Sequence, residues 1–539
     1  MNINLRSNLE NVRIQYTILA TIMLIAAILR IYKLGMWSFW AEEFHTVRHT
    51  AAIDSIESIL GSFRAIYYIL NKPVFLLLGE TEWTARVLPV VFGVLAIPLT
   101  YWITRRLFGF TIAILAAFLL AISPWHLYWS QNARFYTLFL LLFNISFVMY
   151  YLGIENNRFV YIVVSIITLI LATMTHLMAG LLIPVFILYF ILLKIGPFEK
   201  PPGLIILNLL PFIILPILGF VAIEIIRLVF INTIPLYENV YENFISDSRI
   251  FRGYEDPVVM LKSVVYYIGI PLTLSSLFGS VFLLYQRNRA GLFISCGAFF
   301  PLFILMVISP IVTVVNRYVF MTLPFWIILA ALGIHALYRS KNPLLWVLYL
   351  LSLLFLLFRD PVLKDLVYYL NLGQYLPLYI IVVAVLIAIV ILWQLLRINS
   401  EVSLRRNLIL ISIVLLILFI HPMITNTLYF EYQHGHRDNL KAATTLIAMN
   451  KNEGDRVVAA IPLLVEYYLE GETEYVQDFD ANVEPQNNQR IWLIEDSGVD
   501  QIKENSFGYW INQNCRMEGK WDNFTGGRNW KMRVYLCES

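Results

Sequence analysis

The stretch ETEWTARVLPVVFGVLAIPLTYWITRRLFG, residues 80–109, decides the class of protein. Between acidic residues at its start and the Arg105–Arg106 pair near its end lies a long apolar run. A hydrocarbon core about 30 Å thick is crossed by a helix of about 20 apolar residues, so this run predicts a membrane span. Blocks of the same kind recur from Tyr16 to Ile420. The sequence therefore predicts a polytopic α-helical membrane protein.

Composition agrees with this class. Of the 539 residues, 59% are hydrophobic and only 14% are charged, and the mean hydropathy is +0.71. A soluble protein of this size carries more charge to cover its surface. The net charge of +3 gives no reason to expect a nucleic-acid partner.

The apolar blocks predict about 13 transmembrane helices. The first block lacks a small-residue cleavage site, so we interpret it as a retained helix and not as a signal peptide. The expected spans are 14–34, 83–104, 110–123, 135–153, 158–175, 178–194, 203–230, 260–285, 290–310, 317–338, 343–358, 376–397 and 407–422.

The distribution of charge predicts the orientation. With the N-terminus in the cytoplasm, the inner connections hold basic residues such as Arg105, Arg287 and Arg339 and hardly any acids. The outer connections hold many acids, among them Glu42 and Glu43. Because positive charge accumulates on the cytoplasmic side, we expect a multi-pass plasma-membrane protein with its C-terminal end outside the cytoplasm.

Two parts follow from this organisation. Residues 1–430 are the expected membrane core, including an outer loop at 35–82 with two short amphipathic stretches near 46–60 and 63–78. In residues 431–539 the apolar runs become short and polar residues separate them, which predicts a small extracytoplasmic α/β domain. Cys515 and Cys537 in this domain form a disulfide or stay free, and the sequence leaves both open.

The first candidate for chemistry is SFWAEEFHT, residues 38–46, which follows the first span. Glu42 and Glu43 are adjacent carboxylates, so one could accept a proton while the other holds a metal or orients a partner. The alternative is a solvated acidic loop that caps the following helix.

The second candidate is SPWHLYWSQNARFY, residues 123–136, at an outer helix junction. An arginine such as Arg134 is costly at a membrane boundary unless it faces an anion, and its fork of donors matches phosphate oxygens. His126 and Gln131 in the same segment are candidate substrate contacts. The alternatives are snorkelling of Arg134 to the interface and a structural role for the histidine.

Two further arginines start spans from the outer side, where positive charge is scarce. They are Arg86, in EWTARVLP, and Arg317, in NRYVFMTLP. Interfacial anchoring explains one such residue, but several of them facing an acidic loop favour a site for an anionic lipid headgroup.

Together these segments resemble the GT-C class of polytopic glycosyltransferases that use polyprenyl-phosphate sugars, in the family 39-like branch of protein mannosyltransferases and aminoarabinose transferases. The resemblance runs from about residue 30 to 140 and returns at 316–325. In that family an Asp-Glu pair supplies the base. Glu42 and Glu43 occupy those positions here, and the Asp-to-Glu change makes Glu43 the expected base.

The resemblance also implies the phosphate contacts, because Arg134 with Tyr136 matches the family's Arg-x-Tyr and Arg317 with Tyr318 matches its late Arg-Tyr. A His-Pro-Pro element of the family is missing, and RAIYYILNKP, residues 64–73, stands in its region.

The expected function is transfer of a sugar, with inversion, from a polyprenyl-phosphate donor to an acceptor hydroxyl at the outer membrane face. Arg134, Arg317 and Arg86 would stabilise the departing phosphate. No cofactor is required, and a divalent metal on Glu42 and Glu43 is an option. The alternatives are a transporter or flippase of lipid-linked sugars and an inactive scaffold. A transporter is expected to place its polar groups at the bilayer midplane in repeated halves, which the sequence does not show.

Overall fold

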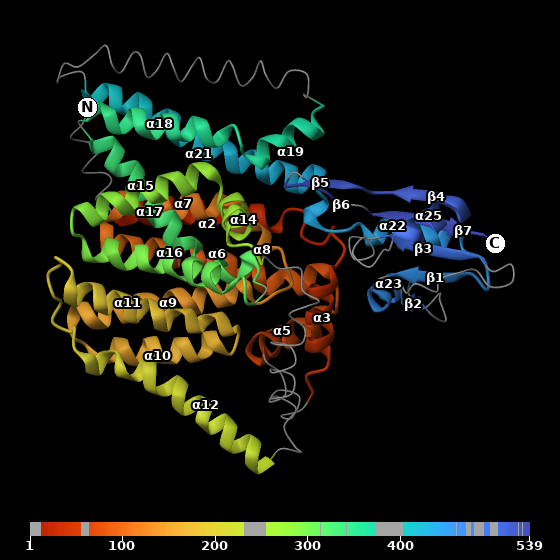
Figure 1. The fold of residues 1–539 in the computed structure, drawn as a ribbon, viewed down its shortest axis with the longest axis horizontal. Coiled ribbons are helices and arrows are strands. Elements are labelled where there is room, and N and C mark those ends of the chain that lie inside the picture. The colour runs from red at the N-terminus through yellow and green to blue at the C-terminus, as the bar shows by residue number, and fades with distance from the viewer. Residues whose placement is uncertain are drawn as a thin grey trace.

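The computed structural model describes residues 12–54, 64–230, 255–312, 314–340, 342–371, 403–459, 461–469, 476–478, 490–495, 505–526, 528–530 and 532–538. Long helices lie side by side and form most of the molecule, and a smaller unit with a sheet lies at one end of them (Figure 1). This arrangement confirms the predicted fold class, a polytopic helical protein with a small C-terminal α/β domain.

The helices of the core follow the apolar blocks. In the described part of the chain, seven helices are long and apolar enough to cross a membrane, or up to ten if each of three bent helix pairs is one span. Four of the seven are the helices Val12–Ile31 (α2), Glu82–Phe108 (α6), Tyr136–Asn156 (α9) and Arg289–Ile308 (α16). The other three are Leu177–Ile195, which includes Leu182–Ile195 (α11), Asn316–Arg339, which includes Leu323–Arg339 (α17), and Asn407–Tyr432, which includes most of Ser403–Thr427 (α21).

The bent pairs are Phe110–Ile122 (α7) with Pro124–Ser130 (α8), Pro257–Ile268 (α14) with Ile270–Tyr285 (α15), and Pro343–Leu357 (α18) with Pro361–Tyr369 (α19). Two further core helices are Phe159–Thr173 (α10) and Leu210–Phe230 (α12). The predicted span 376–397 lies outside the described residues.

One predicted span is wrong as a straight helix. Residues 260–285 form α14 and α15, which meet at an angle of 101°. Gly269 between them has a φ of +92°, a backbone conformation that favours glycine. Pro271 then stands in the first turn of α15, where its missing N–H costs nothing.

Small residues let core helices pack closely, as is common in membrane bundles. A Cβ on Gly279 of α15 would lie 2.0 Å from the carbonyl oxygen of Leu329 on α17. A Cβ on Gly333 of α17 would lie 2.2 Å from the carbonyl oxygen of Ser275. We therefore expect any larger residue at either glycine to push these two helices apart.

The outer loop forms two short helices at the end of the bundle nearest the soluble unit (Figure 1). They are Ala41–Ala51 (α3) and Ala65–Leu78 (α5). The second agrees with the amphipathic stretch predicted at 63–78, and Leu76 and Leu77 in its last turn are 74% and 82% exposed, as suits contact with lipid. The first begins earlier than the stretch predicted at 46–60, part of which lies outside the described residues.

The C-terminal unit is built on a five-stranded mixed sheet of order β2-β1-β3-β7-β4. The strands β1, β2 and β3 are parallel, and β7 pairs antiparallel with β3 and β4. Its elements are Leu440–Asn450 (α22), Arg456–Ala459 (β1), Pro462–Leu469 (α23), Val476–Asp478 (β2), Ile491–Glu495 (β3), Asn505–Asn514 (α25), Cys515–Lys520 (β4), Asn523–Thr525 (β5), Arg528–Trp530 (β6) and Arg533–Cys537 (β7). A disulfide joins Cys515 to Cys537 across β4 and β7.

The C-terminal unit is joined to the loop of residues 35–82 by polar contacts. The hydroxyl of Tyr468 accepts from the backbone N–H of Phe39 at 2.6 Å and donates to Glu82 at 2.9 Å. Lys441 forms an ion pair with Glu82 at 2.8 Å. The sheet domain therefore rests directly on the segment that carries the two adjacent glutamates.

Candidate active site

Glu42 and Glu43 lie in the first turn of α3, where carboxylates interact favourably with a helix N-terminus. Residues 43, 47 and 50 share one helical face, and all three side chains are buried. Glu42 lies one helical step away, and its side chain is 16% exposed whereas that of Glu43 is fully buried. The two adjacent carboxylates therefore have different environments.

Glu43 is surrounded by N–H donors. Arg86 donates to its two oxygens from Nε at 2.9 Å and Nη2 at 2.8 Å. Arg437 donates from Nε at 3.1 Å and Nη2 at 3.4 Å, and the backbone N–H of Ala133 donates at 2.7 Å. Burial raises the pKa of Glu43, but the charges of Arg437 and Arg86 outweigh it and lower the pKa to about 2.

Every N–H group of the Arg86 guanidinium donates a hydrogen bond to another group of the protein. Besides Glu43, its guanidinium donates to the carbonyl oxygens of Leu34, Trp37 and Ser38 at 2.9–3.1 Å. The side chain is fully buried. The prediction that Arg86 binds the donor phosphate does not fit this geometry, because all five of its N–H groups already have acceptors.

Glu42 lies between two arginines whose buried Nε–H groups have no hydrogen-bond partner among the described residues. Its Oε1 is 2.5 Å from Nη2 of Arg317, and its Oε2 is 3.2 Å from Nη2 of Arg134. Arg134 also donates from Nη1 to the backbone oxygen of Glu42 and to Thr46. In the described structure, Oε2 of Glu42 and the Nε–H groups of both arginines have no hydrogen-bond partner.

The pKa of Glu42 lies below its ordinary value. Burial raises the pKa, but Arg317, Arg134 and Arg64 together outweigh burial. Glu42 is therefore ionised at neutral pH, and its carboxylate lies among cations instead of being saturated with hydrogen bonds.

Arg64 belongs to the same cluster, and our sequence analysis did not select it. Its guanidinium lies 4.6 Å from the ring of Phe135, next to Arg134 in the chain. It lies in the loop of residues 35–82 and starts no predicted span, so the argument that selected Arg86 and Arg317 did not apply to it. Arg437, in the segment just before α22, had no such signal.

The tyrosines of the two Arg-Tyr elements also lie near the cluster. Tyr136 and Tyr318 have ring centroids 5.8 and 5.3 Å from the imidazole of His176. Tyr136 is 2% exposed, and its ring packs against that of Trp129 with 4.2 Å between the ring centroids. The ion pairs of Glu42 with Arg134 and Arg317 bring the segments near residues 42, 134 and 317 together.

His126 and Gln131 contact other parts of the protein. The Nδ1 atom of His126 lies 2.6 Å from Nη2 of the buried Arg30. The side-chain amide of Gln131 donates to the backbone oxygens of Arg30 and Tyr32 at 3.0 and 2.7 Å. Both side chains are fully buried, so the predicted substrate contacts from these two residues do not fit.

The predicted option of a metal on Glu42 and Glu43 does not fit their surroundings. Each carboxylate contacts two arginines, whose positive charge disfavours a divalent cation. Among the described residues, no group of three or more His, Cys, Asp or Glu side chains could hold a metal ion. With Arg64, the cluster has five arginines for two glutamates, a balance that favours an anion.

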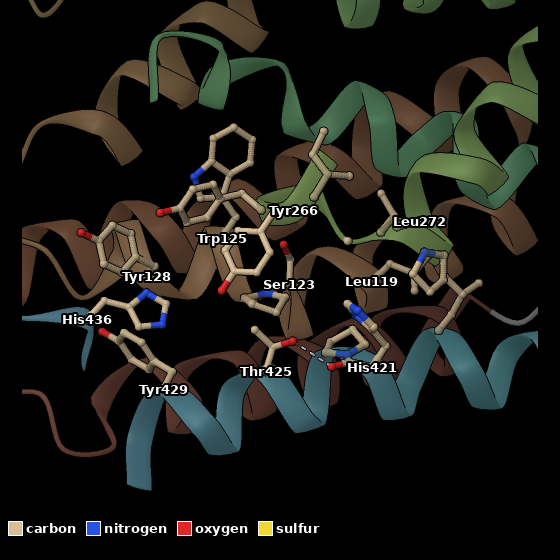
Figure 2. Close-up of a pocket in the computed structure, with 17 residues that line it drawn as sticks. Leu119, Ser123, Trp125, Tyr128, Tyr266, Leu272, His421, Thr425, Tyr429 and His436 are labelled. Carbon is tan, nitrogen blue, oxygen red and sulfur yellow. Dashed lines mark hydrogen bonds between the residues drawn. The ribbon is translucent and has the colours of Figure 1, made fainter. Parts of the chain in front are cut away.

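A pocket opens beside this cluster, between α8, the α14–α15 junction and α21 (Figure 2). Its empty space, counted together with adjoining open solvent, is about 680 Å³. One end is lined by Tyr128, Tyr429 and His436, and the other reaches His421, whose Nε2 lies 2.7 Å from Asp360. Most of the lining is aromatic or aliphatic, which suits an apolar chain or a ring.

A helical membrane bundle with a carboxylate and arginines at the end that carries a mixed α/β domain agrees with the predicted resemblance to GT-C glycosyltransferases. Comparisons with known proteins confirm this predicted resemblance. Residues 66–220 match the family model of dolichyl-phosphate-mannose-protein mannosyltransferase.

Among solved structures, the chain resembles ArnT from Cupriavidus metallidurans in the apo state, with a TM-score of 0.54, 15% identity, and coverage of 96% of this chain and 97% of that chain. The same protein bound to undecaprenyl phosphate gives a TM-score of 0.54, 14% identity and the same coverage. The oligosaccharyltransferase of Archaeoglobus fulgidus matches with a TM-score of 0.47 and 13% identity, over 88% of this chain and 61% of that one. No curated protein sequence matches.

Proposed function

We propose that this protein transfers a sugar from a polyprenyl-phosphate donor to an acceptor hydroxyl at the outer face of the membrane, with inversion. The observation that carries the proposal is the placement of ionised Glu42 between Arg134 and Arg317, both of which keep an unused Nε–H. A carboxylate beside open guanidinium donors supplies a proton acceptor and an anion site side by side. The family match and the ArnT fold, one structure of which binds undecaprenyl phosphate, support a lipid phosphate as that anion.

In this mechanism Glu42 accepts the proton of the acceptor hydroxyl. The hydroxyl oxygen attacks the anomeric carbon and forms the new C–O bond, while the bond from that carbon to the phosphate oxygen breaks. The electron pair leaves with the polyprenyl phosphate, and Arg134, Arg317 and Arg64 stabilise the added charge. A phosphate leaves readily as an anion, so no separate acid is needed.

The base we propose is Glu42, not the Glu43 that the sequence favoured. Five N–H donors surround Glu43 and lower its pKa to about 2, which leaves it a poor proton acceptor without a free lone pair facing a substrate. The side chain of Glu42 is 16% exposed, and its buried Oε2, which lies 3.2 Å from Nη2 of Arg134, accepts no hydrogen bond from the described residues. Glu43 instead anchors the helix that carries the base.

We propose that the pocket of Figure 2 receives an apolar part of a substrate, since its wall is mostly aromatic and aliphatic. The acidic outer loops and basic inner connections support placement of the site on the outer face. The Cys515–Cys537 disulfide supports the same placement, because structural disulfides persist outside the reducing cytoplasm.

The test uses detergent-purified protein, a panel of polyprenyl-monophosphate sugars and a membrane extract as the source of acceptor. Mass spectrometry follows release of free polyprenyl phosphate. We expect wild type to release it from at least one donor and Glu42→Gln to lower kcat about 100-fold or more, the usual contribution of a general base. Glu80→Gln is the matched control, an exposed glutamate of the same outer loop, and should keep full activity.

Absence of release from every donor by folded wild type would refute the function. Full activity of Glu42→Gln would refute the assigned base alone. Glu43→Gln is expected to lower the unfolding temperature as well as activity, because it disturbs the buried cluster.

A further inference from the structure

Arg437 belongs to the segment that leads into the soluble domain, yet its guanidinium lies inside the membrane core's active site. Its side chain is 1% exposed. Besides Glu43, it donates to the backbone oxygen of Gln131 at 2.8 Å, to that of Gly435 at 2.7 Å and to the hydroxyl of Tyr429 at 3.4 Å. None of its five N–H groups is left for a substrate.

These contacts join the two elements that carry the proposed chemistry. Glu43 is the neighbour of Glu42 on α3, so holding Glu43 fixes the rotation of the helix that presents the base. Gln131 opens the short turn from which Arg134 extends, and the N–H of Ala133 in that turn also binds Glu43. Arg437 therefore bridges the base-bearing helix and the phosphate-binding turn.

The backbone before Arg437 has an uncommon conformation. His434, Gly435 and His436 have φ values of +45°, +60° and +57°, in the left-handed region that residues other than glycine rarely adopt. A Cβ on Gly435 would lie 2.8 Å from both the Trp37 ring and Nη1 of Arg437, so this position has no room for a side chain. Strained backbone of this kind persists where the surrounding structure requires it, often at functional sites.

We propose that Arg437 is a positioning residue that sets Glu42 and Arg134 relative to each other, so that the soluble domain is an integral part of the active site. The inference rests on the proposed function. Arg437 acts through Glu43 and the carbonyl of Gln131 and does not touch the substrate. Misplacement of a catalytic group by about 1 Å is enough to lower a rate about 100-fold.

The structure supplies a matched control for domain docking. Lys441 also comes from the soluble domain and reaches the same outer loop, where it contacts Glu82 at 2.8 Å and the carbonyl oxygen of Gly35 at 3.4 Å. It touches neither Glu43 nor the turn after Gln131. Lys441→Gln therefore removes a cation from the same interface without disturbing the bridge.

The experiment is a double-mutant cycle in full-length protein with Arg437→Gln, Glu43→Gln and the double variant, beside Lys441→Gln. We expect Arg437→Gln to lower kcat about 10- to 100-fold and to change the donor KM less than about threefold, because Arg134 and Arg317 remain. The double variant should lose little more than the more damaging single variant, since both changes disrupt one unit. Lys441→Gln should lose less than about twofold.

The proposal would be overturned if the fold losses in kcat of Arg437→Gln and Glu43→Gln multiplied in the double variant. It would also be overturned if Lys441→Gln lost as much kcat as Arg437→Gln. Arg437→Lys keeps the charge with fewer directed hydrogen bonds and should recover part of kcat if Arg437→Gln folds poorly. Wild-type turnover reports on the proposed function by itself. The same cycle read as unfolding temperature tests the bridge without turnover, and additive shifts there would also overturn it.

Discussion

Replacing Arg86 by lysine separates two roles for this arginine. The sequence predicted a contact with the donor phosphate, whereas the structure gives all five N–H groups of Arg86 to Glu43 and to three backbone carbonyls. Lysine keeps the charge but has three N–H donors and no planar fork. Arg86→Lys should therefore weaken the outer-loop anchor while leaving the phosphate cluster of Arg134 and Arg317 intact.

The size of the effect follows from the donors that lysine lacks. At least two hydrogen bonds are lost, and each bond to a charged group contributes about 1.5 kcal/mol or more, so the expected destabilisation is roughly 3 kcal/mol. With an unfolding entropy of about 2 cal/mol/K per residue, a chain of this length should lose about 3 °C in Tm. We also expect kcat to fall about tenfold, with the donor KM unchanged within about twofold.

The assay pairs thermal unfolding in detergent with steady-state kinetics over donor concentration. Arg106→Lys is the control, because it makes the same substitution at an exposed position of the same helix, α6. It should leave Tm, kcat and KM unchanged. An unchanged Tm in Arg86→Lys together with a donor KM raised tenfold would show that Arg86 binds the phosphate and that the anchor role is wrong.

Three further predictions concern pH, metal and orientation. Glu42 has a lowered pKa and must be ionised to act, so wild-type kcat should stay flat as pH falls and decline only below about 4.3, the ordinary range of glutamate. Arg317→Gln removes the largest opposing charge, so its acid limb at saturating donor should move to higher pH, and an unmoved limb would contradict Glu42 as the base. Activity should survive EDTA, measured as polyprenyl phosphate release, because arginines occupy both carboxylates; loss restored by a divalent cation would contradict this. A reporter fused after Ser539 should be active only outside the cytoplasm. Cytoplasmic activity would contradict the predicted odd number of membrane spans.

The fold class could be predicted because a membrane imposes length and hydropathy on each span. Apolar blocks such as residues 80–109 therefore locate helices without knowledge of packing. The bend between α14 and α15 was missed, since Gly269 lies within an apolar run and its positive φ depends on the surrounding structure. A hydropathy pattern carries no information on the direction of a helix axis.

The site was found in outline because Arg134 and Arg317 stand at helix ends on the expected outer side, where basic residues are scarce, and Glu42 belongs to an acidic pair in the same expected region. The role of each residue within the site could not be predicted from the sequence, because it depends on contacts between side chains from distant segments. Local sequence places Glu42 and Glu43 in nearly the same surroundings, and only folding brings Arg86 and Arg437 to one of them. Arg437 follows Glu43 by 394 residues, and no spacing rule connects them.

The division of work between the two glutamates also explains why the cluster has an excess of positive charge. Arg86 and Arg437 form a closed, fully bonded unit with Glu43, which resists rearrangement because any broken pair would leave a buried charge. Arg134 and Arg317 share the single charge of Glu42, although their side chains are only 5% and 16% exposed. Holding two such cations against one carboxylate is unfavourable until an anion arrives. The first unit therefore holds the helix of Glu42 in place. In the proposed function, a bound phosphate balances the charge of the second unit at the step in which Glu42 acts as the base.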